Sequence, residues 1–129
     1  MISRENYSVS NIYSVAISPS EKNVFYILSE NGLDVTRDGG ETFEKIETLL
    51  KDGEVVAHKI VVDPNNKNIL YLVDGKILYK TYNGGETWAP TPLKISWPVK
   101  SFVIDSTNSN NIYMGLAAPP KEPFFLLPF

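Results

Sequence analysis

The chain has 129 residues, enough for one domain with a substantial hydrophobic core. Its net charge is −3 and no basic stripe is present to follow a phosphate backbone, so a nucleic acid partner is not expected. Cysteine is absent, which excludes disulfides and thiolate metal sites. No apolar run approaches the roughly 20 residues of a membrane helix, and no signal peptide is visible, so we expect a soluble protein without a membrane partner.

The first part of the chain predicts four short strands joined by turns. Extended segments are expected at residues 12–17, 24–28, 33–36 and 42–46, with a further short strand at residues 6–9. Before the fourth segment lies the sequence Thr36-Arg37-Asp38-Gly39-Gly40-Glu41-Thr42-Phe43. Asp-Gly between extended segments is a strong hairpin signal, because glycine accepts the positive φ of a tight turn.

A second unit repeats the first at an offset of 45 residues, with the turn returning as Thr81-Tyr82-Asn83-Gly84-Gly85-Glu86-Thr87-Trp88. Asn in place of Asp keeps the side-chain oxygen that accepts backbone N–H groups. Residues 17–27 align with residues 62–72 without gaps, and residues 104–114 follow at an offset of 42. Periods near 40 to 50 residues with four short strands per unit predict β-propeller blades.

The shared pattern Thr-x-Asp/Asn-x-Gly-x-Thr-aromatic resembles the Asp-box, the bacterial neuraminidase repeat of sialidases, sortilin-type receptors, xyloglucanases and photosystem II assembly factors. In those families the box caps a hairpin in each propeller blade. The resemblance implies an all-β, incomplete propeller with two complete four-stranded blades and part of a third. The residues of the two boxes are then structural: Thr36, Asp38, Gly40, Thr42, Phe43, Thr81, Asn83, Gly85, Thr87 and Trp88.

The repeat also predicts the boundaries of the units. Blade 1 is expected at about residues 10–47, blade 2 at about 55–95 and a partial blade 3 at about 98–117. The apolar tail 118–129 is rich in proline, which lacks the backbone N–H that a central strand needs. Because an incomplete propeller exposes apolar blade faces, we expect either a homo-oligomer or a part of a larger propeller.

No catalytic constellation, metal cluster or cofactor motif is visible in the sequence, so the catalytic residues stay unknown and no cofactor is expected. His58, the only histidine, has no Cys or second His as a partner and is predicted to be packed or solvated. A sialidase, as the resemblance implies, holds its substrate with three arginines, and this chain has only Arg4 and Arg37. Sialidase activity is therefore not expected.

Carboxylates are the other candidates, because glycoside hydrolysis needs a pair of them. The carboxylates at candidate positions are Glu30, Asp34, Glu54, Asp63, Asp74 and Asp105. None of these matches the loop aspartates of the xyloglucanases that carry the repeat. Asp63 and Asp105 occupy the same repeat corner, where Ser18 stands in the first unit, which favours a turn-forming role.

Aromatic residues divide into two groups. Tyr26, Tyr71 and Tyr113 recur in register and are predicted to be blade core, whereas Tyr82 and Trp97 break the repeat and are candidates for stacking on a sugar or peptide. The function expected is a non-catalytic binding or assembly scaffold whose partner is a protein or a carbohydrate. Two alternatives stay open: a fragment of a xyloglucanase-like glycoside hydrolase, and a degenerate remnant without separate function.

Overall fold

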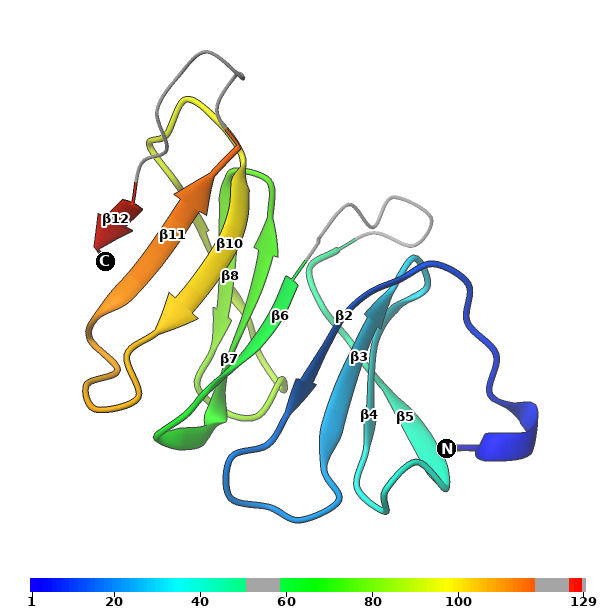
Figure 1. Ribbon diagram of the computed structural model, residues 1–129. Helices are drawn as coiled ribbons and strands as arrows, with labels where there is room; N and C mark the ends of the chain where they lie inside the picture. Colours follow the sequence, from blue (N-terminus) through cyan, green and yellow to red (C-terminus); the bar gives the residue numbers. More distant parts are fainter. Residues whose placement is uncertain (51–58, 118–125, 129) are drawn as a thin grey trace.

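A computed structural model describes residues 1–50, 59–117 and 126–128 of the chain. Over these residues the strands form three antiparallel sheets that lie next to one another in chain order (Figure 1). The one helical element among them is a short 3-10 turn, η1 (Arg4–Asn6). The predicted all-β class is confirmed. None of the helical structure in the described part of the chain is long and apolar enough to cross a membrane.

The three sheets differ in strand number. The first has five strands in the order β1-β5-β4-β3-β2, the second four in the order β6-β7-β8-β9, and the third three in the order β10-β11-β12. The strand bounds are β1 (Ile2–Ser3), β2 (Ile12–Ile17), β3 (Phe25–Ser29), β4 (Gly32–Thr36), β5 (Thr42–Ile46), β6 (Lys59–Asp63), β7 (Asn66–Asp74), β8 (Ile77–Thr81), β9 (Ala89–Pro92), β10 (Val99–Ile104), β11 (Ile112–Leu116) and β12 (Leu126–Pro128).

The N-terminal strand is not where the sequence predicts it. Residues 2–3, rather than 6–9, pair with β5 and add a fifth strand to the outer edge of the first sheet. Arg4 fixes this arrangement, because its backbone N–H donates to Glu41 O at 2.7 Å and its side chain donates to Gly40 O at 3.1 Å. These contacts join segments far apart in sequence, so no local pattern reveals them.

Each sheet has two faces, which we call the leading face and the trailing face. The leading face is the one that carries residues such as Val15 in the first sheet and Ile60 in the second, and the trailing face is the opposite one. Directly paired residues share a face, so the register pairs Val15↔Ile27 and Ile60↔Leu72 lie on leading faces. The pair Ala16↔Tyr26 lies on the trailing face of the first sheet.

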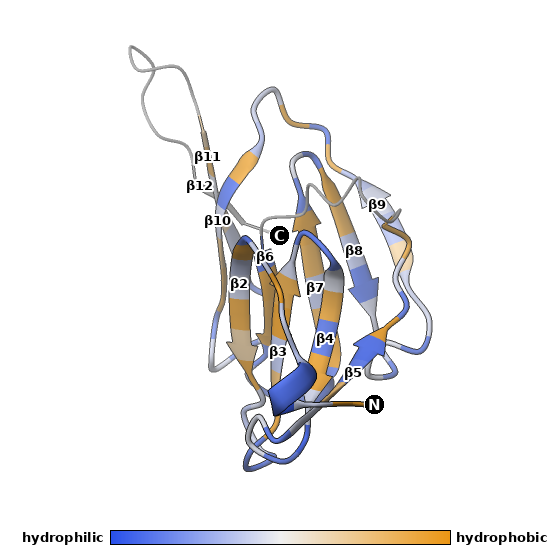
Figure 2. Ribbon diagram, turned by 90° about the vertical axis from the view of Figure 1, so that its right-hand side faces the viewer, coloured by the Kyte–Doolittle hydropathy of each residue, from blue (hydrophilic) through white to orange (hydrophobic). Residues whose placement is uncertain are grey.

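Two apolar cores fill the spaces between the sheets. The first core joins the trailing face of the first sheet to the leading face of the second, where residues such as Tyr26, Leu28 and Leu72 are buried together. The second core joins the trailing face of the second sheet to the leading face of the third, through residues such as Tyr71, Phe102 and Met114. The fold thus repeats one kind of interface, trailing face on leading face. In Figure 2 the strands that face these cores are coloured largely as hydrophobic.

The predicted burial of the three repeated tyrosines holds for two of them. Tyr26 and Tyr71 are buried in the first and second cores, whereas Tyr113 is exposed, and its assignment to the core is wrong. Tyr113 pairs with Val103 on the trailing face of the third sheet. The position is equivalent in the repeat, but no further sheet of the described chain packs on it.

Of the tail 118–129, the structure describes residues 126–128. They pair with β11 as β12, the last strand in the order of the third sheet. Pro128 therefore lies in an edge strand, where a missing backbone N–H is tolerated.

Candidate functional site

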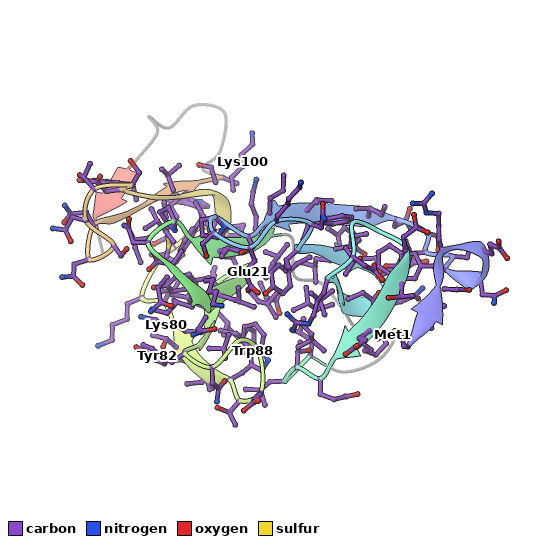
Figure 3. The ribbon with its side chains drawn as sticks, turned by 90° about the horizontal axis from the view of Figure 1, so that it is seen from below. Met1, Glu21, Lys80, Tyr82, Trp88 and Lys100 are labelled. Carbon is purple, nitrogen blue, oxygen red and sulfur yellow. The ribbon has the colours of Figure 1, made fainter. Side chains whose placement is uncertain are left out.

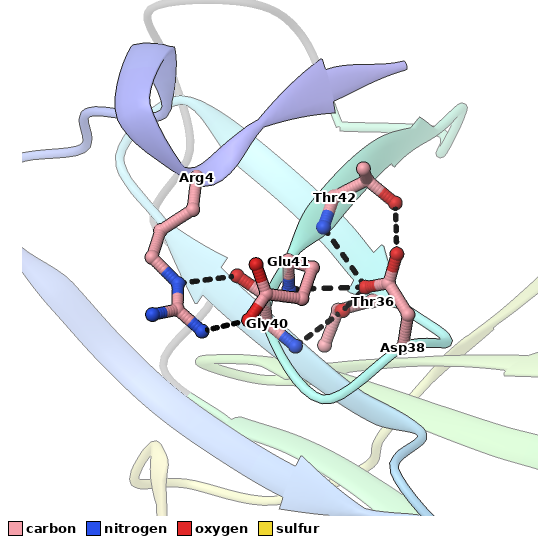
Figure 4. Close-up of polar contacts among 6 residues, drawn as sticks. All are labelled: Arg4, Thr36, Asp38, Gly40, Glu41 and Thr42. Atoms are coloured by element: carbon pink, nitrogen blue, oxygen red, sulfur yellow. Dashed lines mark hydrogen bonds and ion pairs between the residues drawn. The ribbon is translucent and has the colours of Figure 1, made fainter.

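The first glycine turn, residues 36–43, is held by the carboxylate of Asp38 (Figure 4). Asp38 Oδ1 accepts hydrogen bonds from Thr36 Oγ1 at 3.0 Å, Glu41 N at 3.0 Å and Thr42 N at 2.8 Å. Asp38 Oδ2 accepts from Thr42 Oγ1 at 2.6 Å. Gly40 has a φ of 95° and donates its N–H to Thr36 Oγ1 at 2.8 Å. All four of these hydrogen bonds to the carboxylate come from the turn that contains Asp38.

These hydrogen bonds favour the ionised carboxylate. The Thr42 hydroxyl is the largest cause and the Thr42 N–H the next, and they lower the pKa of Asp38 to about 2. A carboxyl group with so low a pKa is a poor proton donor near neutral pH. The geometry suits Asp38 to fixing a turn.

The second glycine turn, residues 81–88, repeats this geometry with an amide. Asn83 Oδ1 accepts from Thr81 Oγ1 at 2.8 Å and from Thr87 N at 3.0 Å. Asn83 Nδ2 donates to Thr87 Oγ1 at 2.8 Å, which reverses the polarity of the Asp38–Thr42 contact. Gly85 N donates to Thr81 Oγ1 at 3.1 Å. A neutral amide therefore performs the same local task as the carboxylate.

The repeated corner residues are also acceptors for their own turns. Ser18 Oγ accepts from Glu21 N at 3.2 Å, and Asp63 Oδ1 accepts from Asn65 N at 2.7 Å. Asp105 Oδ1 accepts from Thr107 N at 2.8 Å and from the Thr107 hydroxyl at 2.7 Å. The hydroxyl is the largest cause of the lowered pKa of Asp105. The geometry agrees with the turn-forming role that the repetition favours.

Asp34 is the buried carboxylate that the repeat does not explain. It accepts a hydrogen bond from Tyr7 Oη at 2.9 Å, and Lys45 Nζ lies 4.0 Å away. Burial, followed by this contact with Asp34, raises the pKa of Tyr7, so the phenol stays protonated and acts as a donor. The group lies beside a cavity of about 130 Å³ between residues 2–9 and the first sheet.

The remaining candidates from the sequence are dispersed. Glu30 accepts hydrogen bonds from the Ser10 hydroxyl and, at 2.8 Å, from Asn11 Nδ2; the Ser10 contact is the larger cause of its lowered pKa. Asp74 lies at the end of β7, and the nearby phenol of Tyr79 has a raised pKa, chiefly from burial and then from the Asp74 charge. His58 and Glu54 lie outside the described residues. Among the residues that the structure describes, no group of three His, Cys, Asp or Glu side chains has the arrangement of a metal site.

A groove that the sequence did not predict runs between the first sheet and the second glycine turn. It has a volume of about 360 Å³. Its carboxylates are Glu44, Glu47 and Glu86, and Arg37 also lines it. No repeated motif marks these glutamates, so only the packing of the two units brings them together.

The two stacking candidates have different surroundings. Tyr82 is 65% exposed, and Lys80 Nζ lies 4.3 Å from the centre of its ring (Figure 3). Trp97 is half-buried and packs against the second core. Trp88 has its indole N–H directed to Glu47 O at 3.0 Å and Gly85 O at 3.1 Å, and its ring packs against the first core. Tyr82 is thus the most exposed of these three rings.

Comparison with solved structures identifies the fold. An ancestral GH74 enzyme superposes with a TM-score of 0.65 at 21% identity, covering 81% of this chain and 16% of that one. The GH74 enzyme of Niastella koreensis gives 0.64 at 22% identity, covering 96% and 22%. The GH74 xyloglucanase from Xanthomonas campestris gives 0.63 at 15% identity, covering 97% and 23%. These enzymes are β-propellers.

The three sheets are propeller blades. This confirms the predicted fold class, and β1 is an addition to the four strands expected in the first blade. At these identities the likeness concerns the fold alone, and the chain spans only 16% to 23% of the length of the three enzymes. No protein-family model and no curated protein matches the chain.

Proposed function

We propose that this chain is a non-catalytic binding or assembly scaffold made of Asp-box propeller blades. The two glycine turns support the Asp-box assignment, because they follow the same residue pattern and the same hydrogen-bond geometry. Propeller blades carry many unrelated functions, so the function depends on the side chains rather than on the fold.

The hydrogen-bond partners of the carboxylates are the observation that carries the proposal. Glycoside hydrolysis needs two carboxyl groups about 5 to 10 Å apart that face a substrate. Asp38, Asp63 and Asp105 instead accept hydrogen bonds from their own turns. Asp34 is buried against Tyr7. These four carboxylates act in the blades as structural acceptors.

The alternative is a fragment of a xyloglucanase-like glycoside hydrolase. The fold likeness to GH74 enzymes favours it, and so does the groove that Glu44, Glu47 and Glu86 line. In that case part of the catalytic machinery lies in a longer protein. Xyloglucan would then bind along the groove, with turnover absent or weak in this chain.

The test is to measure both xyloglucan hydrolysis and xyloglucan binding by the purified chain. Reducing ends released from xyloglucan report hydrolysis, and affinity electrophoresis in gels with and without xyloglucan reports binding. We expect no release above that of a Glu44→Gln, Glu86→Gln double variant, which removes two groove carboxylates without changing side-chain size. Release by the wild type that the double variant lacks would establish the hydrolase alternative and overturn the scaffold.

The third possibility is a degenerate remnant, and the cooperativity of unfolding distinguishes it from a scaffold. A scaffold must fold cooperatively, so urea unfolding followed by Trp fluorescence and by circular dichroism will give coincident transitions. The fluorescence probes are Trp88 and Trp97, which contact different cores. Non-coincident, broad transitions from an aggregating chain would support the remnant instead.

A further inference from the structure

The two ends of the stack of blades carry exposed apolar residues at positions that pack into a core at every internal interface. On the leading face of the first blade, Val15 and Ile17 are 54% and 75% exposed. Their equivalents 45 residues later are Ile60 and Val62, both of which pack into the first core. The equivalents in the third blade, Phe102 and Ile104, are buried in the second core.

The trailing face of the third blade shows the complementary pattern. Val103 and Tyr113 are 59% and 40% exposed. Their equivalents in the second blade are Val61 and Tyr71, which pack into the second core, and those in the first blade are Ala16 and Tyr26, which pack into the first. The leading face of the first blade and the trailing face of the third blade could therefore form one more interface of the kind that occurs twice within the chain.

We propose that the leading face of the first blade docks on the trailing face of the third blade of a second copy of this chain. This proposal rests on the scaffold function and names its partner. Continuity with the internal interfaces supports it, because each of them pairs a trailing face with a leading face. Two copies supply six blades, within the range of about four to eight found in closed propellers. Closure at both ends gives a two-copy ring.

The N-terminal segment limits where the second copy docks. Tyr7 stacks on Phe43 with ring centres 3.8 Å apart and interplanar angle 13°, which covers the outer part of the leading face. Phe43 is equivalent to Trp88, which packs on the first core in the second blade. The inner part of the face, along β2, stays open, and β2 is coloured largely as hydrophobic in Figure 2. Docking thus involves β2 and the strand next to it in one copy, and β10 and the strand next to it in the other.

A pair of matched variants tests this head-to-tail contact. Val15→Lys blocks the leading face and Val103→Lys blocks the trailing face, and the two valines have nearly equal exposure. A lysine at either site is solvated in the single chain, so both variants are expected to fold, which circular dichroism and a cooperative melt will verify. Tyr82→Lys is the control, because Tyr82 is at least as exposed as the two valines but lies on the second glycine turn.

The readout is mass by light scattering on a size-exclusion column across a dilution series. We expect the wild type and Tyr82→Lys to show twice the chain mass of 14.4 kDa. Each valine variant alone is expected to be monomeric, with an apparent dissociation constant raised by about tenfold or more, because a charge is buried unpaired at the contact. An equimolar mixture of Val15→Lys and Val103→Lys will restore a one-to-one dimer, since each supplies the face that the other lacks.

Other outcomes overturn the proposal. A wild type that stays monomeric at all concentrations shows that a second copy does not cover these faces. A dimer of Val103→Lys alone shows that two leading faces pair with each other, and a dimer of Val15→Lys alone shows that two trailing faces do. None of these results bears on xyloglucan hydrolysis, so the scaffold function stands or fails by its own test.

Discussion

Ser109, in the corner of the third blade, donates a hydrogen bond of 2.7 Å to Asp63 Oδ1 in the corner of the second blade. The same Ser109 hydroxyl accepts from Asn65 Nδ2 at 2.9 Å. Asp63 is 1% exposed, so this contact links two blades through a buried carboxylate. The corner of the second blade therefore has two tasks, since Asp63 closes its own turn and connects to the next unit.

Replacing Asp63 by alanine will test both tasks. We expect Asp63→Ala to lower the free energy of unfolding by about 1–3 kcal/mol, because Asn65 N and the Ser109 hydroxyl lose a buried acceptor. Ser109→Ala will cost less, about 0.5–1.5 kcal/mol, because Asp63 Oδ1 keeps its hydrogen bond from Asn65 N and the lost contact with Asn65 Nδ2 is exposed. Asp63→Asn is the matched control, since it keeps the acceptor oxygen. Urea unfolding measures all three, and equal losses for Asn and Ala at this position would contradict the assignment.

The first glycine turn will respond to acid and the second will not. The pKa of Asp38 is lowered to about 2 by Thr42 and the other donors of its turn. A carboxyl whose pKa is lower in the folded state stabilises above its unfolded pKa of about 3.9, and this contribution is lost as the pH falls towards 2. We therefore expect Asp38→Asn to show a smaller loss of unfolding free energy than the wild type between about pH 4 and 2.

Asn83→Asp is the reciprocal control for this prediction. It places a carboxylate where Thr87 N and the Thr87 hydroxyl can donate to it, as Thr42 does to Asp38. We expect it to increase the loss of stability in acid. Glu30 and Asp105 also have lowered pKa values in every variant, so the difference between variants is the quantity to measure. Parallel pH profiles for the wild type and Asp38→Asn would refute the role of Asp38.

The sequence predicts much of the blade core and both glycine turns, because the information for them is local or repeated. Recurrence in register places Tyr26 and Tyr71 correctly, and the turn pattern demands the positive φ seen at Gly40 and Gly85. Tyr113 fails because burial depends on what packs against a face, and the repeat shows only which way a side chain points. Equivalent positions at the end of a stack have the same direction and a different neighbour.

The polar group at the edge of the first blade was missed for another reason. Tyr7 and Asp34 are 27 residues apart, and Arg4 and Gly40 are 36 residues apart. No periodicity connects the N-terminal residues to the sheet that they cover. The groove with Glu44, Glu47 and Glu86 likewise depends on how two blades pack, which a repeat offset does not specify. For the polar group that contains Tyr7, the only signal in the sequence was Asp34 itself, a carboxylate in a strand whose other residues are suited to burial.

Two glycines with positive φ are expected to differ sharply in their tolerance of alanine. At Gly85, φ is 99° and a Cβ atom would lie 2.8 Å from Ile46 Cγ2, at the contact between two blades. At Gly75, φ is 55° and nothing lies within 4 Å. Gly75→Ala will cost about 1–2 kcal/mol, the ordinary penalty for the left-handed region. Gly85→Ala will cost more, because the clash adds to the backbone strain, and thermal melts of the two variants measure the difference. Equal melting temperatures would show that the blade contact yields without cost.

Tyr7 is expected to stabilise the first blade by two separable contacts. Tyr7→Phe keeps the stack on Phe43 and removes the donor to Asp34, which we expect to cost about 1–3 kcal/mol because a buried carboxylate loses a hydrogen bond. Tyr7→Ala removes both contacts and will cost more. Urea unfolding near neutral pH gives both values, and an unchanged stability of Tyr7→Phe would show that Lys45 and solvent satisfy Asp34 without the phenol.

Alkaline pH gives an independent check on the same residue. Burial, and then the Asp34 contact, raises the pKa of Tyr7 above its ordinary value of about 10. A group with a raised pKa in the folded state contributes its stability below the unfolded pKa and loses it as the pH rises. The wild type will therefore lose more unfolding free energy above about pH 10 than Tyr7→Phe does. Tyr26 and Tyr79 also have raised pKa values, but they are present in both proteins, so only a difference between the two alkaline profiles assigns the effect to Tyr7.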